Sequence, residues 1–75
     1  MIQKLDSILS GIFCMPAEKI TDDLTMKNLE IWDSLRHMNL IMSLEEAYSI
    51  ELTMDEIMIM VDVATIRQII SEKTA

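Results

Sequence analysis

Apolar residues recur at helical spacing in three longer segments and one short segment of this chain. In the first segment they lie three or four positions apart, which is the pattern of one buried helix face. The members of this face are Ile2, Leu5, Ile8, Leu9, Ile12 and Phe13. Proline disfavours helical backbone at the residue before it, so this helix is predicted to end before Met15-Pro16. Residues 16–33, with a turn-forming cluster at 21–23, predict a long ordered loop that holds one helical turn.

The second segment, residues 34–48, has apolar residues on two separate faces of a helix. It contains neither Gly nor Pro. One face is wide enough to bury against other helices, and its members are Leu40, Ile41, Leu44, Ala47 and Tyr48. A second strip lies on another side of the helix beside two acids, and it consists of Leu35, Met38 and Met42 next to Glu45 and Glu46. This strip has no evident use inside the molecule, and we interpret it as a docking surface for another protein.

Two further helices are predicted after a short extended link at residues 49–52. Thr53 and Glu56 fit the capping box, which starts a short third helix that runs to about Met60. Because residues 57–61 form a nearly unbroken apolar run, we expect this helix to be mostly buried. Asp62 caps the fourth helix, whose apolar face consists of Val63, Ile66, Ile69 and Ile70. The pattern therefore predicts an all-α fold, a small four-helix bundle, with residues 1–75 as a single domain.

Composition and charge narrow the possible functions of the chain. Seventy-five residues, of which 51% are hydrophobic and 25% charged, are typical of one small globular domain. A deep catalytic cleft is not expected at this size. The formal charge of −7 disfavours binding to nucleic acid and anionic membranes, and it favours basic patches on proteins. Residues 37–66 contain acids but neither Lys nor Arg, which strengthens the expectation of a basic partner.

The sulfur-containing residues and the hydropathy pattern indicate a cytoplasmic protein. Cys14 is the single cysteine, so an internal disulfide is impossible, and we expect its side chain to be buried near the end of the first helix. Most of the eight methionines are expected to fill the core, with Met38 and Met42 as exceptions. The beginning of the chain lacks a signal-peptide pattern. No apolar run reaches the roughly 20 residues that span a bilayer.

Ser34 and His37 invite a catalytic interpretation, which the rest of the chain does not support. The two residues lie three positions apart on one helix, beside Asp33. Nucleophilic catalysis also needs an oriented base, an oxyanion site and a dry pocket, and the chain offers no residues for these. His37 is instead expected to be a half-buried structural residue. Residues 22–23 lack the ligand pattern of a calcium loop, and no metal site is predicted.

Ser34 stands where a phosphate ester would be favourable. Unpaired amides and the positive end of the helix dipole both stabilise negative charge at the first turn of a helix. Ser34 can also be an ordinary helix-capping residue, and its position alone does not distinguish the two roles.

A wider pattern favours the phosphate ester. Asp33-Ser34-Leu35 opens a two-faced helix about halfway along an acidic four-helix chain, and residues 44–52 follow in a matching register. This pattern resembles the acyl carrier protein family over essentially the whole chain. The resemblance implies a non-catalytic carrier in which a phosphopantetheinyl transferase attaches 4'-phosphopantetheine from coenzyme A to Ser34. It also implies that the thiol of this arm holds an acyl or aminoacyl group as a thioester.

The resemblance also implies partners and site residues. The partners are a loading enzyme and a ketosynthase or acyltransferase with basic docking patches, and the carrier is expected to be a monomer. The family's recognition surface corresponds here to Asp33, Leu35, Met38, Met42, Glu45 and Glu46. Our candidates for lining a cargo site are Leu44, Leu52, Ile57 and Met60.

Departures from the family's usual pattern leave alternatives open. Arg36 and Asn39 stand where fatty-acid carriers usually have acids, and Trp32 with Ile31 replaces a small lead-in that contains glycine. We therefore expect a specialised stand-alone carrier for fatty-acid, polyketide or related biosynthesis. The alternatives are a peptidyl or aminoacyl carrier and, in another class, an unmodified acidic adaptor that binds a basic partner helix.

Overall fold

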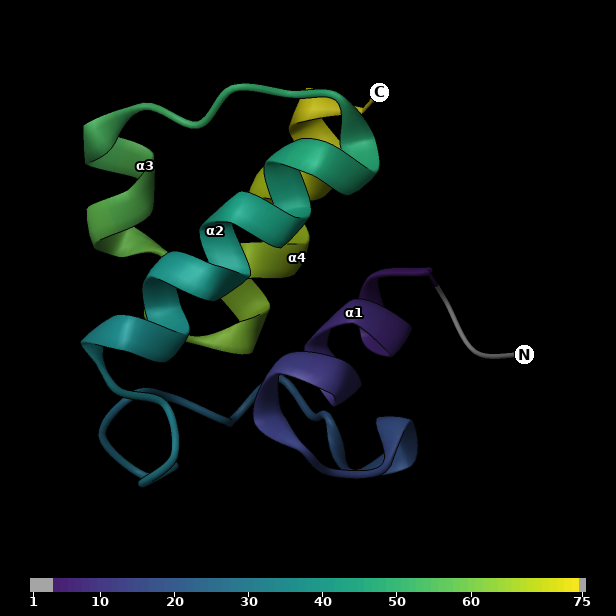
Figure 1. Cartoon of the computed structure of the whole chain (residues 1–75), viewed down its shortest axis with the longest axis vertical. Coiled ribbons are helices and arrows are strands. Elements are labelled where there is room, and N and C mark those ends of the chain that lie inside the picture. The colour runs from purple at the N-terminus through teal and green to yellow at the C-terminus, as the bar shows by residue number, and fades with distance from the viewer. Residues whose placement is uncertain (1–3, 75) are drawn as a thin grey trace.

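Four α-helices and one 3-10 turn form the regular structure of residues 4–74, the part of the chain that the computed structural model describes (Figure 1). They are α1 (Lys4–Phe13), η1 (Ala17–Lys19), α2 (Ser34–Tyr48), α3 (Met54–Ile59) and α4 (Val63–Lys73). The predicted helices, and the helical turn within the long loop, are thereby confirmed. Ile2, assigned to the first helix from the sequence, lies outside the described residues.

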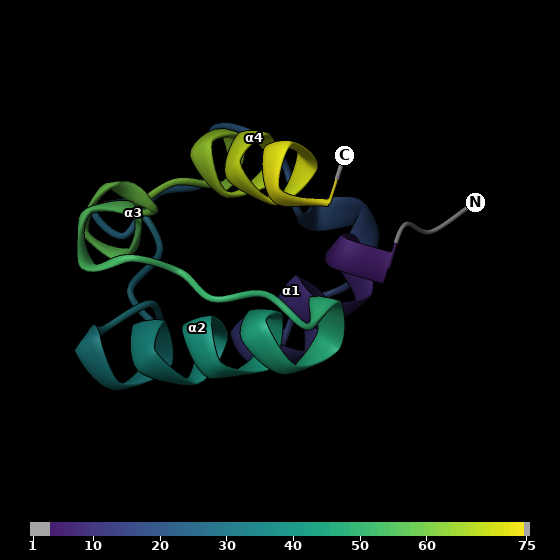
Figure 2. The same ribbon diagram turned by 90° about the horizontal axis from the view of Figure 1, so that it is seen from above.

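The core lies between α2 and α4, which face each other across the molecule. Figure 2 shows α3 closing one side of this pair, and Figure 1 shows α1 beside the long loop that leads to α2. The buried apolar side chains come from α1, α2, α4 and the connecting segments. They are Leu9, Phe13, Ile20, Trp32, Leu40, Ile41, Leu44, Leu52, Met60, Val63, Ile66, Ile69 and Ile70. The predicted inner face of α2 is therefore confirmed for its three most buried members, Leu40, Ile41 and Leu44.

Side-chain caps begin three of the helices. Asp33 caps α2 by accepting a hydrogen bond from the Arg36 amide at 2.9 Å, so the capping role considered for Ser34 belongs to the preceding residue. Thr53 and Glu56 form the complete capping box predicted for α3. Asp62 caps α4 as predicted, with its carboxylate 2.6 Å from the Thr65 amide. Each cap satisfies an amide that has no partner within its helix.

The expectation that α3 is mostly buried is wrong. Met54, Met58 and Ile59 are 71%, 67% and 58% exposed, and none of the helical residues of α3 is buried. Within α3, Ile57 is half-buried and packs against the core, and the buried side chains of this region are those of the flanking residues Leu52 and Met60. The apolar run is too long for one face of a short helix that packs at the side of the bundle, so part of it meets solvent.

Two expectations about sulfur-containing residues are also wrong. Cys14 is exposed, because the chain leaves α1 with a left-handed backbone at this residue (φ 56°). Among residues 4–74, Met60 is the one fully buried methionine. Most of the others lie on the surfaces of α2 and α3 or are half-buried.

The long loop is held to the helices by specific hydrogen bonds. The Arg67 guanidinium binds Asp6 of α1 at 2.8 Å, Asp22 of the loop at 2.9 Å and the Ile20 carbonyl at 2.9 Å. Thr25 and Asp62 form an isolated antiparallel bridge between the loop and the start of α4. These contacts attach a long segment with little regular structure to α1 and α4.

None of the helices in residues 4–74 combines the length and the apolar character that crossing a membrane requires.

Glu56 gives the fold a defined acid sensitivity. The Thr53 backbone N–H and the Lys73 ammonium, 2.9 Å away, hold the pKa of the Glu56 carboxyl below its ordinary value of 4.5. A depressed pKa means that the unfolded chain binds this proton more readily, so the stabilising contribution is present above pH 4.5 and declines below it. We expect Glu56→Gln to be less stable than wild type at pH 7, with a smaller difference at pH 3.5. Urea denaturation at both pH values measures this, and an unchanged difference would contradict it.

Candidate functional site

Ser34 is exposed at the first position of α2, where the long loop delivers the chain to the helix (Figure 1). The Asp33 side chain accepts from the Arg36 amide, and the Asp33 carbonyl accepts from the His37 amide at 2.9 Å. Within residues 4–74, the amides of Ser34 and Leu35 and the Ser34 hydroxyl have no hydrogen-bond partner. An accessible hydroxyl beside two free amides at the positive end of a helix suits a phosphodiester group.

The segment before Ser34 is fixed by a buried aromatic cluster. Trp32 is 2% exposed, and its ring lies 4.7 Å from that of Phe13, measured between centroids. Its indole N–H donates to His37 Nδ1 at 3.1 Å, and His37 Nε2 lies 2.9 Å from the Ile57 carbonyl oxygen. His37 is more deeply buried than expected, at 9% exposure. Since both ring nitrogens have partners elsewhere, the ring does not activate the Ser34 hydroxyl in this structure.

The predicted outer strip of α2 is present as an exposed apolar surface. Leu35 is 71% exposed, Met38 51% and Met42 63%. Helix α2 therefore has the two apolar faces that its sequence predicts, one in the core and one in solvent. The use of the outer strip for docking stays a prediction.

The three acids assigned to the recognition surface have different environments. Asp33 is exposed but its carboxylate caps α2. Glu45 is half-buried, and its Oε2 accepts a hydrogen bond from the Leu52 amide at 2.9 Å. Glu46 is exposed. Glu46 is thus the acid of this set with the greatest freedom to meet a basic partner.

Arg36 has an internal role that its position in the sequence does not reveal. Its Nη1 donates to the Ile12 carbonyl at 2.7 Å and lies 3.6 Å from the sulfur of Cys14. Carbonyls in the last turn of a helix lack partners within the helix, and basic side chains satisfy them well. The positive charge of Arg36, two residues after Ser34, is therefore bound to the end of α1.

The candidate cargo-lining residues belong to the core or pack against it. Leu44 and Met60 are fully buried, Leu52 is 8% exposed and Ile57 is half-buried. Their role in holding cargo stays a prediction.

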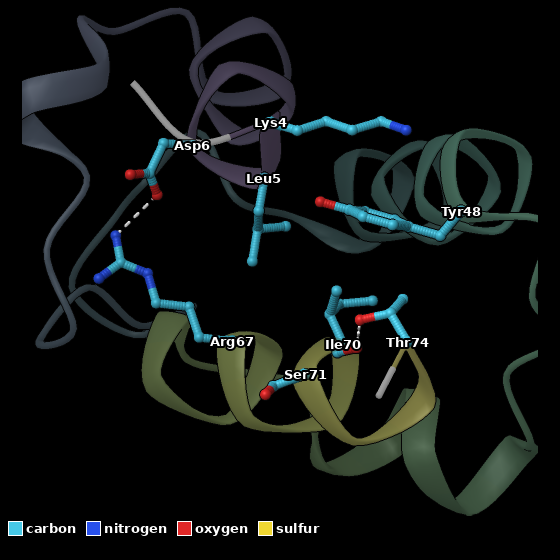
Figure 3. Close-up of a pocket in the computed structure, with 8 residues that line it drawn as sticks. All are labelled: Lys4, Leu5, Asp6, Tyr48, Arg67, Ile70, Ser71 and Thr74. Carbon is cyan, nitrogen blue, oxygen red and sulfur yellow. Dashed lines mark hydrogen bonds and ion pairs between the residues drawn. The ribbon is translucent and has the colours of Figure 1, made fainter. Parts of the chain in front are cut away.

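Two open pockets lie elsewhere on the molecule. A groove of about 410 Å³ lies at the end of α2 opposite to Ser34 (Figure 3), and its lining residues are Lys4, Leu5, Asp6, Tyr48, Arg67, Ile70, Ser71 and Thr74. Burial, and secondarily the charge of Asp6, raises the pKa of the Tyr48 phenol, so this group is neutral at pH 7. A second pocket of about 340 Å³ lies between the loop and the start of α4, lined by Thr25, Met26, Lys27, Val61 and Asp62. Neither pocket contains the candidate cargo-lining residues.

Comparison with known proteins agrees with this geometry. The family model described as "Phosphopantetheine attachment site" matches residues 3–72, which include Ser34 and all four helices except the end of α4. No protein with curated annotation matches the chain. Domains of the matched family carry covalently bound 4'-phosphopantetheine, serve in general as non-catalytic carriers and interact with a phosphopantetheinyl transferase. The chain belongs to the phosphopantetheine attachment family, in agreement with its resemblance to acyl carrier proteins.

Proposed function

We propose that Ser34 is the attachment residue and that the chain is an acyl carrier of a specialised biosynthetic pathway. The observation that carries the attachment site is the exposed Ser34 hydroxyl at the start of α2, beside two free amides and within the matched region. In the reaction, the Ser34 oxygen forms a bond to the phosphorus that bears pantetheine. The phosphoanhydride bond of coenzyme A breaks, adenosine bisphosphate leaves, and the hydroxyl proton passes to a base of the transferase.

A promiscuous phosphopantetheinyl transferase with coenzyme A tests the attachment directly. We expect the intact mass of the full chain to rise by one phosphopantetheinyl group, and fragmentation of the modified protein to place this mass on Ser34. An unchanged mass would favour the unmodified adaptor, and a modification on another residue would refute the assignment to Ser34.

The apolar character of the candidate cargo-lining residues supports an acyl cargo over an aminoacyl cargo. The candidate lining residues Leu44, Leu52, Ile57 and Met60 are all apolar, and an apolar lining stabilises a hydrocarbon chain better than a charged ammonium group. Loading of the modified protein by an acyl ligase or by an adenylating enzyme, each with ATP, distinguishes the two carriers by the mass of the thioester. A thioester formed with amino acids alone would favour the peptidyl or aminoacyl carrier.

The outer strip of α2 is the docking surface in this proposal. Leu35 lies next to Ser34 and exposes 71% of its surface, so a partner that acts on the arm would cover it. We expect Leu35→Ala to lower the kcat/KM of the transferase by about fivefold or more, which corresponds to a contact worth about 1 kcal/mol. The control is Thr53→Ser. This position lies away from the outer strip, and serine retains the hydroxyl that caps α3. Equal kcat/KM for Leu35→Ala and wild type would remove Leu35 from the docking surface.

A further inference from the structure

The exposed methionines of this chain lie on two helices. Within residues 4–74 they are Met38 and Met42 on α2 and Met54 and Met58 on α3, and each exposes at least half of its surface. Met60, between α3 and α4, is fully buried. A small oxidant dissolved in water therefore reaches the thioether sulfurs on the surface of α2 and α3, while the sulfur in the core is protected.

Two of these methionines make up most of the outer strip of α2. Met38 and Met42 follow Leu35 at intervals of three and four residues, which places the three side chains in one line along the helix. Leu35 directly follows Ser34, so the line starts beside the proposed attachment residue. The apolar character of the strip thus depends on two sulfur atoms, and a thioether, unlike a leucine side chain, becomes polar when it is oxidised.

The surroundings of the two methionines offer little to a newly formed sulfoxide oxygen. This oxygen accepts hydrogen bonds, and the acids that follow Met42 on the same side of α2, Glu45 and Glu46, carry carboxylates that also only accept at pH 7. Residues 37–66 contain neither Lys nor Arg, and the guanidinium of Arg36 is bound to the end of α1. Water would therefore solvate the oxygen in the free protein. A partner surface that is complementary to a thioether is apolar at that point, so it would remove this water without providing a donor.

We propose that hydroperoxides oxidise Met38 and Met42 to methionine sulfoxide, and that this modification stops partners from docking on the outer strip. In the reaction, the thioether sulfur attacks one peroxide oxygen, the O–O bond breaks and a sulfur–oxygen bond forms. With hydrogen peroxide, the sulfur loses two electrons and water is the other product. The inference rests on the proposed function, because the outer strip has to be the docking surface for the modification to affect partners. It adds a regulation of that surface which sulfoxide reductases can reverse.

Oxidation of the outer strip leaves the fold intact in this proposal. Met38 and Met42 are exposed, so water solvates their sulfoxide oxygens in the folded chain as it does in the unfolded chain. We expect the midpoint of urea denaturation, followed by circular dichroism, to be the same for the peroxide-treated and the untreated chain. A large fall in the midpoint would attribute a loss of docking to unfolding, and it would overturn the proposal.

Mass spectrometry after peroxide treatment tests the sites of modification. The wild-type chain, before attachment of phosphopantetheine, is treated with hydrogen peroxide, the peroxide is removed, and dithiothreitol reverses disulfide formation at Cys14. We expect fragmentation to place one added oxygen on each of Met38 and Met42 and none on Met60. Unchanged Met38 and Met42 in a chain whose α3 methionines are oxidised would overturn the proposal.

The transferase assay tests the effect on docking, with each protein compared with its own untreated form. We expect oxidation to lower the kcat/KM of the wild-type chain by about tenfold or more, and a methionine sulfoxide reductase to restore it. The double variant Met38→Leu, Met42→Leu keeps an apolar strip without sulfur, so its kcat/KM should not change on oxidation. The matched variant Met54→Leu, Met58→Leu removes the same number of thioethers from α3, and it should lose activity as wild type does.

The possible outcomes separate this inference from the proposed function. The same loss in wild type and in the double variant of α2 would show that peroxide acts elsewhere, for example at Cys14, and would overturn the inference. No loss on oxidation, combined with a reduced kcat/KM for Leu35→Ala, would also overturn it but would leave the docking surface in place. No loss on oxidation and an unchanged kcat/KM for Leu35→Ala would remove the docking surface itself, and the inference with it.

Discussion

Ser34→Ala is expected to abolish addition of phosphopantetheine completely, while the protein keeps its fold. The variant lacks the single oxygen that forms the ester in our proposal. The fold is preserved because Asp33, and not Ser34, caps α2, and because the Ser34 hydroxyl makes no hydrogen bond within residues 4–74. Removal of an exposed side chain of this kind changes the free energy of unfolding by about 0.5 kcal/mol or less. Intact mass after treatment with coenzyme A and the transferase measures the outcome, and urea denaturation checks the fold.

Two other serines provide matched controls for this experiment. Ser43 lies on the same helix and is half-buried, and Ser49 follows the helix and is exposed. We expect Ser43→Ala and Ser49→Ala to accept the phosphopantetheinyl group as wild type does. A modified Ser34→Ala protein would show that another residue is the acceptor, and the proposed function would then need a different site.

Leu44→Ala is expected to destabilise the fold severely, while the same substitution at Leu35 has little effect. Leu44 is fully buried, and loss of a buried leucine costs about 2–5 kcal/mol through lost burial and the cavity that remains. A domain of this length has a free energy of unfolding of roughly 4–11 kcal/mol, so the variant would lose a large part of its stability. Leu35, on the same helix, is 71% exposed, and Leu35→Ala should cost about 0.5 kcal/mol or less.

The pair tests the two-faced nature of α2 with identical chemistry at both positions. Urea denaturation gives both free energies of unfolding under the same conditions. Equal losses at Leu35 and Leu44 would contradict the assignment of one face to the core and the other to solvent. Together with the transferase assay of Leu35→Ala, the pair separates a residue that stabilises the fold from one that contacts a partner.

Local patterns in the sequence are sufficient to predict the helices of this protein. Periodic apolar residues, the proline at 16 and the caps at Thr53 and Asp62 each act within a few residues, and the structure confirms the elements that they predict. The two faces of α2 are predictable for the same reason, since a continuous helix fixes the directions of its side chains.

Long-range polar contacts account for most of what the sequence could not predict. Arg36 binds the carbonyl of Ile12, 24 residues away, and the His37 ring contacts the carbonyl of Ile57, 20 residues away. Neither partner is evident from local spacing in the sequence. Glu45 meets the Leu52 amide only because Ser49 takes a left-handed backbone and turns the chain back. The exposure of α3 is likewise decided by where this short helix packs, which its apolar run does not specify.

The guanidinium of Arg67 binds three groups from two parts of the chain, α1 and the long loop, and one of these groups, the Asp6 carboxylate, is 61 residues away. During synthesis on the ribosome, α1 and the loop can therefore acquire their final arrangement only after residue 67 has emerged. Loop closure over such a separation slows folding, because chain entropy is lost before the contact forms. Nascent chains that end before Arg67 should accordingly remain sensitive to protease, and protection should appear once this residue is free of the exit tunnel.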